Sequence, residues 1–159
     1  MIYNFDNHLK YFTLESKINN TAVTYDNENN LKISSMILKE LSKSLLSLSL
    51  YYLDLKLAIN PNDLQTFFEN CKQVELKKLL IRNRSNENVD TTLKVIKDFV
   101  KEKNIEFLAY NIIKLPTKDD VCHKNLENLV EEIQSFTKMV KYDDLIIRVS
   151  EVDGNLSNS

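Results

Sequence analysis

Glycine is almost missing from this chain. Its 159 residues include one glycine, Gly154, together with two prolines and no tryptophan. GxGxxG motifs, P-loops and GxSxG elbows all need glycine where the backbone approaches a phosphate or turns sharply at a nucleophile. The sequence therefore excludes these common nucleotide-binding and hydrolase motifs.

An excess of either charge and long apolar runs are missing as well. The chain has 21 basic and 23 acidic residues, for a net charge of −2, which argues against a basic nucleic-acid groove. No window approaches the ~18 apolar residues of a membrane span, and the first residues do not form a signal peptide. Two cysteines, Cys71 and Cys122, are too few for a disulfide framework or a four-ligand zinc site. We expect a cytoplasmic or nuclear protein with reduced cysteines.

What the chain does contain is a short apolar run that recurs. Leucine and other apolar residues follow an L-x-x-L-x-L-like spacing, whose alternation predicts strands with one buried face. The runs occur at residues 9–14, 50–57, 76–81, 105–110 and 142–147. Their central residues Leu53, Leu79 and Leu108 are about 26 and 29 residues apart, within the ~20–29 residues of leucine-rich repeats.

Each gap between the runs holds one helical pattern. Apolar residues recur at i, i+3 and i+4 in the segments 33–45, 60–71, 88–104 and 117–136. Asn60 followed by Pro61 is typical of a helix start. Asn104 is placed to end a helix in a left-handed conformation in place of glycine.

Alternating strands and helices at one period predict parallel strands joined by right-handed crossovers. We expect an α/β solenoid, a short leucine-rich-repeat horseshoe with parallel strands on the concave side and helices on the convex side. Residues 1–152 form a single domain of four or five units in this interpretation. Its first unit is irregular, with a loop at about 15–30 that can include a short strand at 21–25, and residues 153–159 form a disordered tail.

The run VELKKLLIRN resembles the ribonuclease-inhibitor-like leucine-rich repeats of fungal F-box proteins. The closest segments are NPNDLQTFFENCKQVELKKLLIRN and NVDTTLKVIKDFVKEKNIEFLAY, and the resemblance covers roughly residues 45–150. The ninth motif position, usually Asn or Cys, is occupied by Ala58, Arg84 and Ile113 in the three best units, and Asn83 lies one residue before it.

The resemblance implies a substrate adaptor of a ubiquitin ligase. In that family an amino-terminal F-box docks onto a cullin-type ligase and the repeats hold the target. The first residues of this chain show no F-box helices with the expected Leu-Pro start, so the resemblance reaches only the substrate-binding repeats.

The strand residues that point away from the apolar runs are the candidate binding site. On a pleated strand, alternate residues share a face, and stacking the strands gives a concave surface for a protein or peptide. The nine residues assigned to it are Tyr52, Asp54, Lys56, Lys78, Leu80, Arg82, Phe107, Ala109 and Asn111, flanked by Tyr11, Thr13 and Glu15 and by Asp144, Ile146 and Arg148. We expect Tyr52, Leu80 and Phe107 to supply affinity. Replacing Tyr52 and Phe107 with alanine should then abolish partner binding and leave stability nearly unchanged.

Other functional interpretations of the sequence have less support. His123 with Asp119 and Asp120 offers two metal ligands at helical spacing but no third. Solvated or packed positions explain the following residues better than a functional site does: the pairs Glu131–Glu132 and Asp143–Asp144, the basic residues between 72 and 84, and the two cysteines. We therefore expect a non-catalytic binding module with no cofactor or metal and no nucleic-acid or membrane partner. A truncated repeat remnant that associates with itself is the alternative.

Overall fold

The architecture is a parallel sheet with helices on one face. A computed structural model of the chain describes residues 10–16, 27–45, 50–85, 88–112 and 120–141. The strands are β1 (Tyr11–Glu15), β2 (Tyr52–Leu57), β3 (Lys78–Asn83), β4 (Phe107–Ile112) and β5 (Lys138–Met139). The helices are α1 (Asn27–Leu45), α2 (Pro61–Asn70), α3 (Val89–Lys103) and α4 (Asp120–Gln134).

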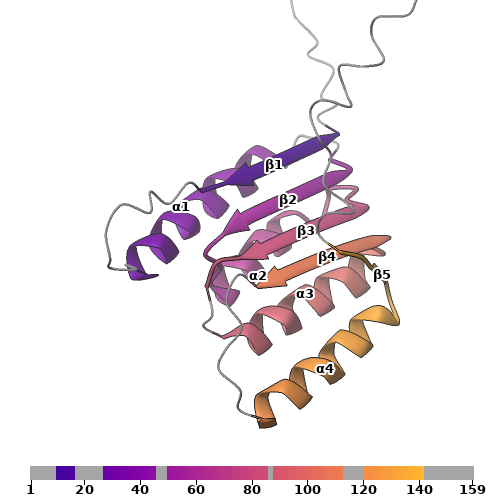
Figure 1. Cartoon of the computed structure of the whole chain (residues 1–159). Helices are drawn as coiled ribbons and strands as arrows, with labels where there is room; N and C mark the ends of the chain where they lie inside the picture. Colours follow the sequence, from indigo (N-terminus) through magenta and orange to yellow (C-terminus); the bar gives the residue numbers. More distant parts are fainter. Residues whose placement is uncertain (1–9, 17–26, 46–49, 86–87, 113–119, 142–159) are drawn as a thin grey trace, which may run out of the picture.

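The strands lie side by side in chain order, β1-β2-β3-β4-β5, and every neighbouring pair is parallel. Figure 1 shows the helices on one face of this sheet, where each helix also lies beside the next. The predicted α/β class, the parallel pairing and the helical layer agree with the structure.

The main core lies between the sheet and the helices. Register pairing aligns Leu53, Leu79 and Leu108 in one row, with Leu55 and Ile81 in the next. These side chains pack against buried residues of all four helices: Leu38 and Leu45 of α1, Leu64 and Phe67 of α2, Leu93, Ile96 and Val100 of α3, and Leu129 and Ile133 of α4. The apolar runs therefore face the helices, as their alternation predicts.

Local signals set the helix ends. The Asn60 side chain accepts a hydrogen bond of 2.9 Å from the Asn62 amide, and Pro61 occupies the first turn of α2. Asn104 ends α3 with φ 53° and ψ 49°, and its N–H bonds to the Val100 carbonyl. Asparagine tolerates this left-handed conformation better than most residues, which is why it replaces glycine here.

Two predicted boundaries need correction. α1 begins at Asn27 rather than near residue 33, so residues 27–30 belong to a helix and not to the expected loop. The fifth strand is Lys138–Met139, paired with Phe107 and Leu108 of β4. The segments predicted as a strand at 142–147, a short strand at 21–25 and a tail at 153–159 lie outside the described residues.

Candidate functional site

The nine predicted site residues share one face of the sheet, opposite the helices; we call it the second face. Register pairing arranges them in three rows. These rows are Tyr52, Lys78 and Phe107; Asp54, Leu80 and Ala109; and Lys56, Arg82 and Asn111. β1 extends the rows with Tyr11, Thr13 and Glu15, as predicted, and Lys138 extends the first row on β5. The flanking residues Asp144, Ile146 and Arg148 lie outside the described residues.

The centre of the second face is buried, which contradicts the expectation of an exposed surface. Tyr52 is 2% exposed, and Leu80 and Ala109 are 0% exposed. These three side chains form a small second core against which Val140 packs. Asp54, which pairs in register with Leu80, is buried beside them. Neighbouring parallel strands lie only about 4.8 Å apart, so Leu80 and Ala109 of the second row are close enough to pack together and with Tyr52 of the first row.

Aromatic rings and lysines alternate where the second face meets the amino ends of the strands. Lys78 Nζ lies 5.5 Å from the centroid of the Phe107 ring and 5.7 Å from that of Tyr51, and Lys138 Nζ lies 5.6 Å from the centroid of Phe107. On the other side, the rings of Tyr11 and Tyr52 are 5.9 Å apart. We call Tyr11, Tyr51, Lys78, Phe107 and Lys138 the aromatic–lysine strip.

Sequence reasoning missed Tyr51 and Lys138 as members of this strip. Tyr51 precedes β2, and its carbonyl accepts hydrogen bonds from the amides of Lys77 and Lys78, which fixes it beside β3. Lys138 was missed because the fifth strand was expected further along the chain. A signal for this strand was available in the sequence, because its period-2 pattern places Phe136, Lys138 and Val140 on one side and smaller or helix-facing residues on the other.

At the carboxyl ends of the strands the charges pair with one another. Glu15 lies 3.5 Å from Lys56 Nζ and 3.0 Å from Arg84 Nη2, and Arg84 also donates to the Ser16 carbonyl. Such pairs are partly exposed and contribute about 1 kcal/mol or less each. They connect β1 to β2 and to the turn after β3 rather than forming a reactive centre.

Asn83, at the end of β3, is a buried polar residue whose side chain hydrogen-bonds to the backbone of two turns. Its Oδ1 accepts hydrogen bonds from the Ile59 amide (3.0 Å) and the Ser85 amide (2.9 Å). One side chain therefore joins the turn after β2 to the turn after β3. Asn83, which makes these bonds, lies one place before the usual position of asparagine in the repeat motif. Arg84 occupies the motif position itself, and its side chain is partly exposed and paired with Glu15.

Two buried titratable groups accompany the core. Burial raises the pKa of the Tyr110 phenol to about 12, an effect that the neighbouring Asn83 side chain partly offsets. The Tyr110 hydroxyl and Asn83 Nδ2 are both buried, and the two make no hydrogen bond of good geometry. Burial also raises the pKa of the Cys71 thiol to about 12, against the opposing charge of Lys103. A thiol held neutral in this way is a weak nucleophile.

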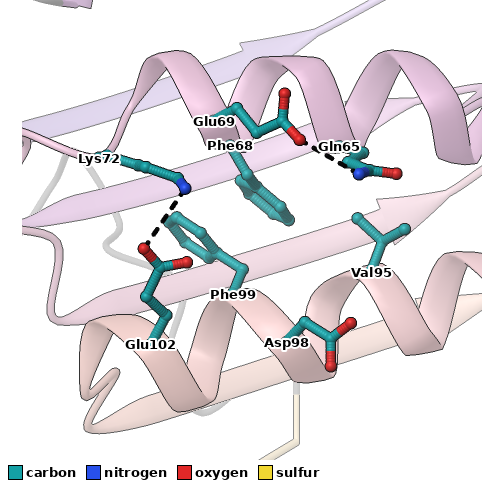
Figure 2. A pocket seen from close by; sticks show the side chains of 8 residues that line it. All are labelled: Gln65, Phe68, Glu69, Lys72, Val95, Asp98, Phe99 and Glu102. Carbon is teal, nitrogen blue, oxygen red and sulfur yellow. Dashed lines mark hydrogen bonds and ion pairs between the residues drawn. The ribbon is translucent and has the colours of Figure 1, made fainter.

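A groove of about 180 Å³ runs between α2 and α3 on the helical layer (Figure 2). Its floor is Phe68 stacked on Phe99, with centroids 3.8 Å apart and planes 6° from parallel. Its rim pairs Lys72 with Glu102 at 3.5 Å and Gln65 with Glu69 at 3.1 Å. None of the eight side chains that line it is a serine, histidine or cysteine.

The remaining sequence candidates do not converge on a site. Glu132 pairs with Lys97 at 2.8 Å, and Lys77 pairs with Glu106 at 3.8 Å. Asp119, Asp143 and the side chains of Asp120, Cys122 and His123 lie outside the described part of the chain. Among the residues that are described, no three His, Cys, Asp or Glu side chains are grouped to hold a metal ion.

Two further findings bear on the class of protein. None of the helices in the described ranges has both the length and the apolar character needed to cross a membrane. Comparison of the chain with protein-family models, with curated proteins and with solved structures gave no match.

Proposed function

We propose that the chain is a short leucine-rich-repeat-like solenoid that binds another protein without catalysing a reaction. The observation that carries this proposal is the aromatic–lysine strip, a preformed row of rings and cations on the second face. Tyrosine and phenylalanine rings are common anchors in protein interfaces, and charged groups set orientation and partner choice.

The architecture supports the solenoid part of the proposal. Strands in chain order, helices on one face and repeat spacings of about 26 and 29 residues are typical of leucine-rich repeats. The bonds from the Asn83 side chain to two successive turns have the same effect as the asparagine of the repeat motif, because they satisfy buried backbone amides.

The strip favours a partner that presents carboxylates next to apolar side chains. Lys78 and Lys138 lie on either side of the Phe107 ring, so an acidic group of the partner would meet two cations while an apolar group packs on the ring. The backbone of β2, β3 and β4 holds these side chains in place, which lowers the entropy cost of binding. The buried Tyr52 and Leu80 support the strip from below and do not contact the partner.

The partner class follows from the resemblance to F-box protein repeats. We propose that the partner is a protein target, such as a substrate for ubiquitination, met in the cytoplasm or nucleus. Lys56, Arg82 and Asn111, at the other edge of the second face, extend the contact surface in this proposal.

The test is a double charge reversal on the strip, Lys78→Glu with Lys138→Glu. The matched control is Lys94→Glu with Lys101→Glu, which makes the same charge change on α3, on the helical side of the sheet. Proteins captured from cell extract by the three forms are quantified side by side, and the affinity of any purified partner is measured by calorimetry. We expect binding to fall at least tenfold for the strip variant and to stay unchanged for the control.

Circular dichroism and urea unfolding of all three forms show whether each variant is folded. Equal capture by the strip variant and the unmodified chain would refute the proposal. Equal loss in both variants would show that binding depends on net charge rather than on the strip.

A further inference from the structure

We infer that the β1 end of the sheet is a self-association surface, on which a second copy of this chain adds its own β1 in antiparallel orientation. The inference is independent of the aromatic–lysine strip as a binding surface for other proteins. It rests on the hydrogen-bonding edge of β1, on its side-chain pattern and on the apolar flank of α1.

One edge of β1 is unpaired by any described strand, and its backbone presents a defined set of groups. The carbonyl of Lys10 bonds to the Tyr52 amide at 2.9 Å, and the Ser16 amide bonds to the Lys56 carbonyl at 3.2 Å. Residues 10, 12, 14 and 16 therefore direct their N–H and C=O groups toward β2. Because these directions alternate along a strand, the N–H and C=O groups of Tyr11, Thr13 and Glu15 point away from β2. Within the described ranges β1 pairs with no strand other than β2.

A two-fold axis through Thr13 satisfies all of these outward groups. In an antiparallel pair centred on that residue, Thr13 lies opposite Thr13 of the second copy, and Tyr11 lies opposite Glu15 of the second copy. Each of these is a hydrogen-bonded pair, so the three outward N–H groups and three outward C=O groups of each copy all find partners. The contact is self-complementary, as an isologous interface requires.

The side chains favour the same register. Phe12 lies opposite Leu14 of the second copy on the helix-facing side, and threonines face each other on the second face, both of which are favourable cross-strand pairs. Phe12 and Leu14 are only partly buried, whereas Leu53 and Leu55, their partners on β2, are fully buried. A second copy would extend the core over Phe12 and Leu14, and a slip of one residue would turn them to the other face.

The helical layer at this end is also apolar. Two of the most exposed large apolar side chains among the described residues, Ile33 (51%) and Met36 (63%), lie on α1. Ser42 of α1 contacts Asn70 of α2 at 3.4 Å, and Ile33 is about two and a half turns away, on the opposite flank of α1. Repeat arrays normally end in a polar surface, so an apolar flank beyond β1 of the described sheet indicates a covered surface.

The first test uses Thr13→Pro and Ile33→Glu in sedimentation equilibrium over micromolar to submillimolar concentrations. Proline at residue 13 removes only an N–H that points away from β2, because the hydrogen bonds to β2 are made by the neighbouring residues. Edge strands tolerate proline at such a position. Phe136→Glu is the matched control, since it adds the same charge at another exposed apolar residue, beside Lys101.

We expect the unmodified chain and the control to shift with concentration from 18.6 kDa toward twice that mass. We expect each of the two β1-end variants to raise the dissociation constant at least tenfold. A monomer at every concentration, or a dimer that survives both variants, would overturn the inference. Ile33→Glu keeps the test decisive if Thr13→Pro does not fold.

The second test checks the register directly. Opposed residues of a hydrogen-bonded pair have Cα atoms about 5.5 Å apart, within the range that a disulfide spans. Under mild oxidation Thr13→Cys should therefore form a covalent dimer, whereas the matched control Thr91→Cys, exposed on α3, should not exceed the unmodified chain. Equal cross-linking of the two variants would rule out pairing centred on Thr13.

Discussion

Asn83 shows how one buried amide can connect two repeating units. It is fully buried, and its Oδ1 serves both the Ile59 and Ser85 amides. The sequence motif pointed to residue 84 for this role. Sequence spacing alone does not reveal which of two adjacent polar residues faces the core, because that depends on where the strand ends, and β3 includes Asn83.

Replacing Asn83 with alanine should lower the free energy of unfolding by about 2–3 kcal/mol, because two buried amides lose their acceptor. Asn111→Ala is the control, since that residue is exposed on β4 and should change stability by about 0.5 kcal/mol or less. Urea denaturation of the three proteins measures the difference. Similar values for the two variants would mean that water replaces the amide in the turn.

Cys71 and Tyr110 make the fold sensitive to alkaline pH. Both have a pKa raised to about 12 in the folded state, from 9.0 and 10.0, so the folded chain holds more protons than the unfolded chain between those values. The stability that these two groups contribute is therefore fully present below pH 9 and is lost as the pH rises toward 12, by about 1.4 kcal/mol per pH unit for each group within its window.

Cys71→Ala should delay the onset of this loss from about pH 9 to about pH 10, where Tyr110 alone remains. Urea midpoints from pH 8 to 11 give the two profiles, and their slopes are compared because the substitution also changes packing. Superimposable slopes between pH 9 and 10 would show that the thiol ionises in the folded protein as it does in the unfolded chain.

At the scale of elements, the sheet is packed on both faces, although the period-2 pattern marked only one. Strand positions and parallel pairing were predictable, because Leu53, Leu79 and Leu108 alternate with other residues and recur at repeat spacing. Burial of the second face was not predictable, because on that face Tyr52 shares its strand with Asp54, and Leu80 shares its strand with Lys78 and Arg82. Such a mixture of apolar and charged residues is typical of a solvated face. The second core joins Tyr52 of the first row to Leu80 and Ala109 of the second row, and this grouping becomes visible only once the register is known.

Tyr52→Ala should therefore destabilise the protein by about 3–5 kcal/mol, as expected for loss of a buried aromatic side chain. This reverses the expectation from sequence that Tyr52 could be removed at little cost. Tyr51→Ala is the natural control, since the adjacent ring is 37% exposed and should cost about 1 kcal/mol. Thermal or urea unfolding of the two single variants decides the matter, and equal losses would place Tyr52 at the surface.

For the whole molecule, the sequence predicted the class and the succession of elements better than the surfaces. The helix ends at Asn60 and Asn104 follow from local chemistry, which acts within a few residues. The aromatic–lysine strip brings Tyr51, Phe107 and Lys138 together from three units. A strand boundary misplaced by a few residues, as for β5, is enough to lose one member of such a set.

The strand order β1-β2-β3-β4-β5 also sets how the chain can fold and vary. Among the strands in the described part of the chain, each pairs only with the one before it and the one after it, so every pairing closes a loop of a single strand-helix segment. Folding can then start at any adjacent pair of strands and spread outward. Gain or loss of one strand-helix segment at the carboxyl end changes the length of the array without rearranging the pairings that remain.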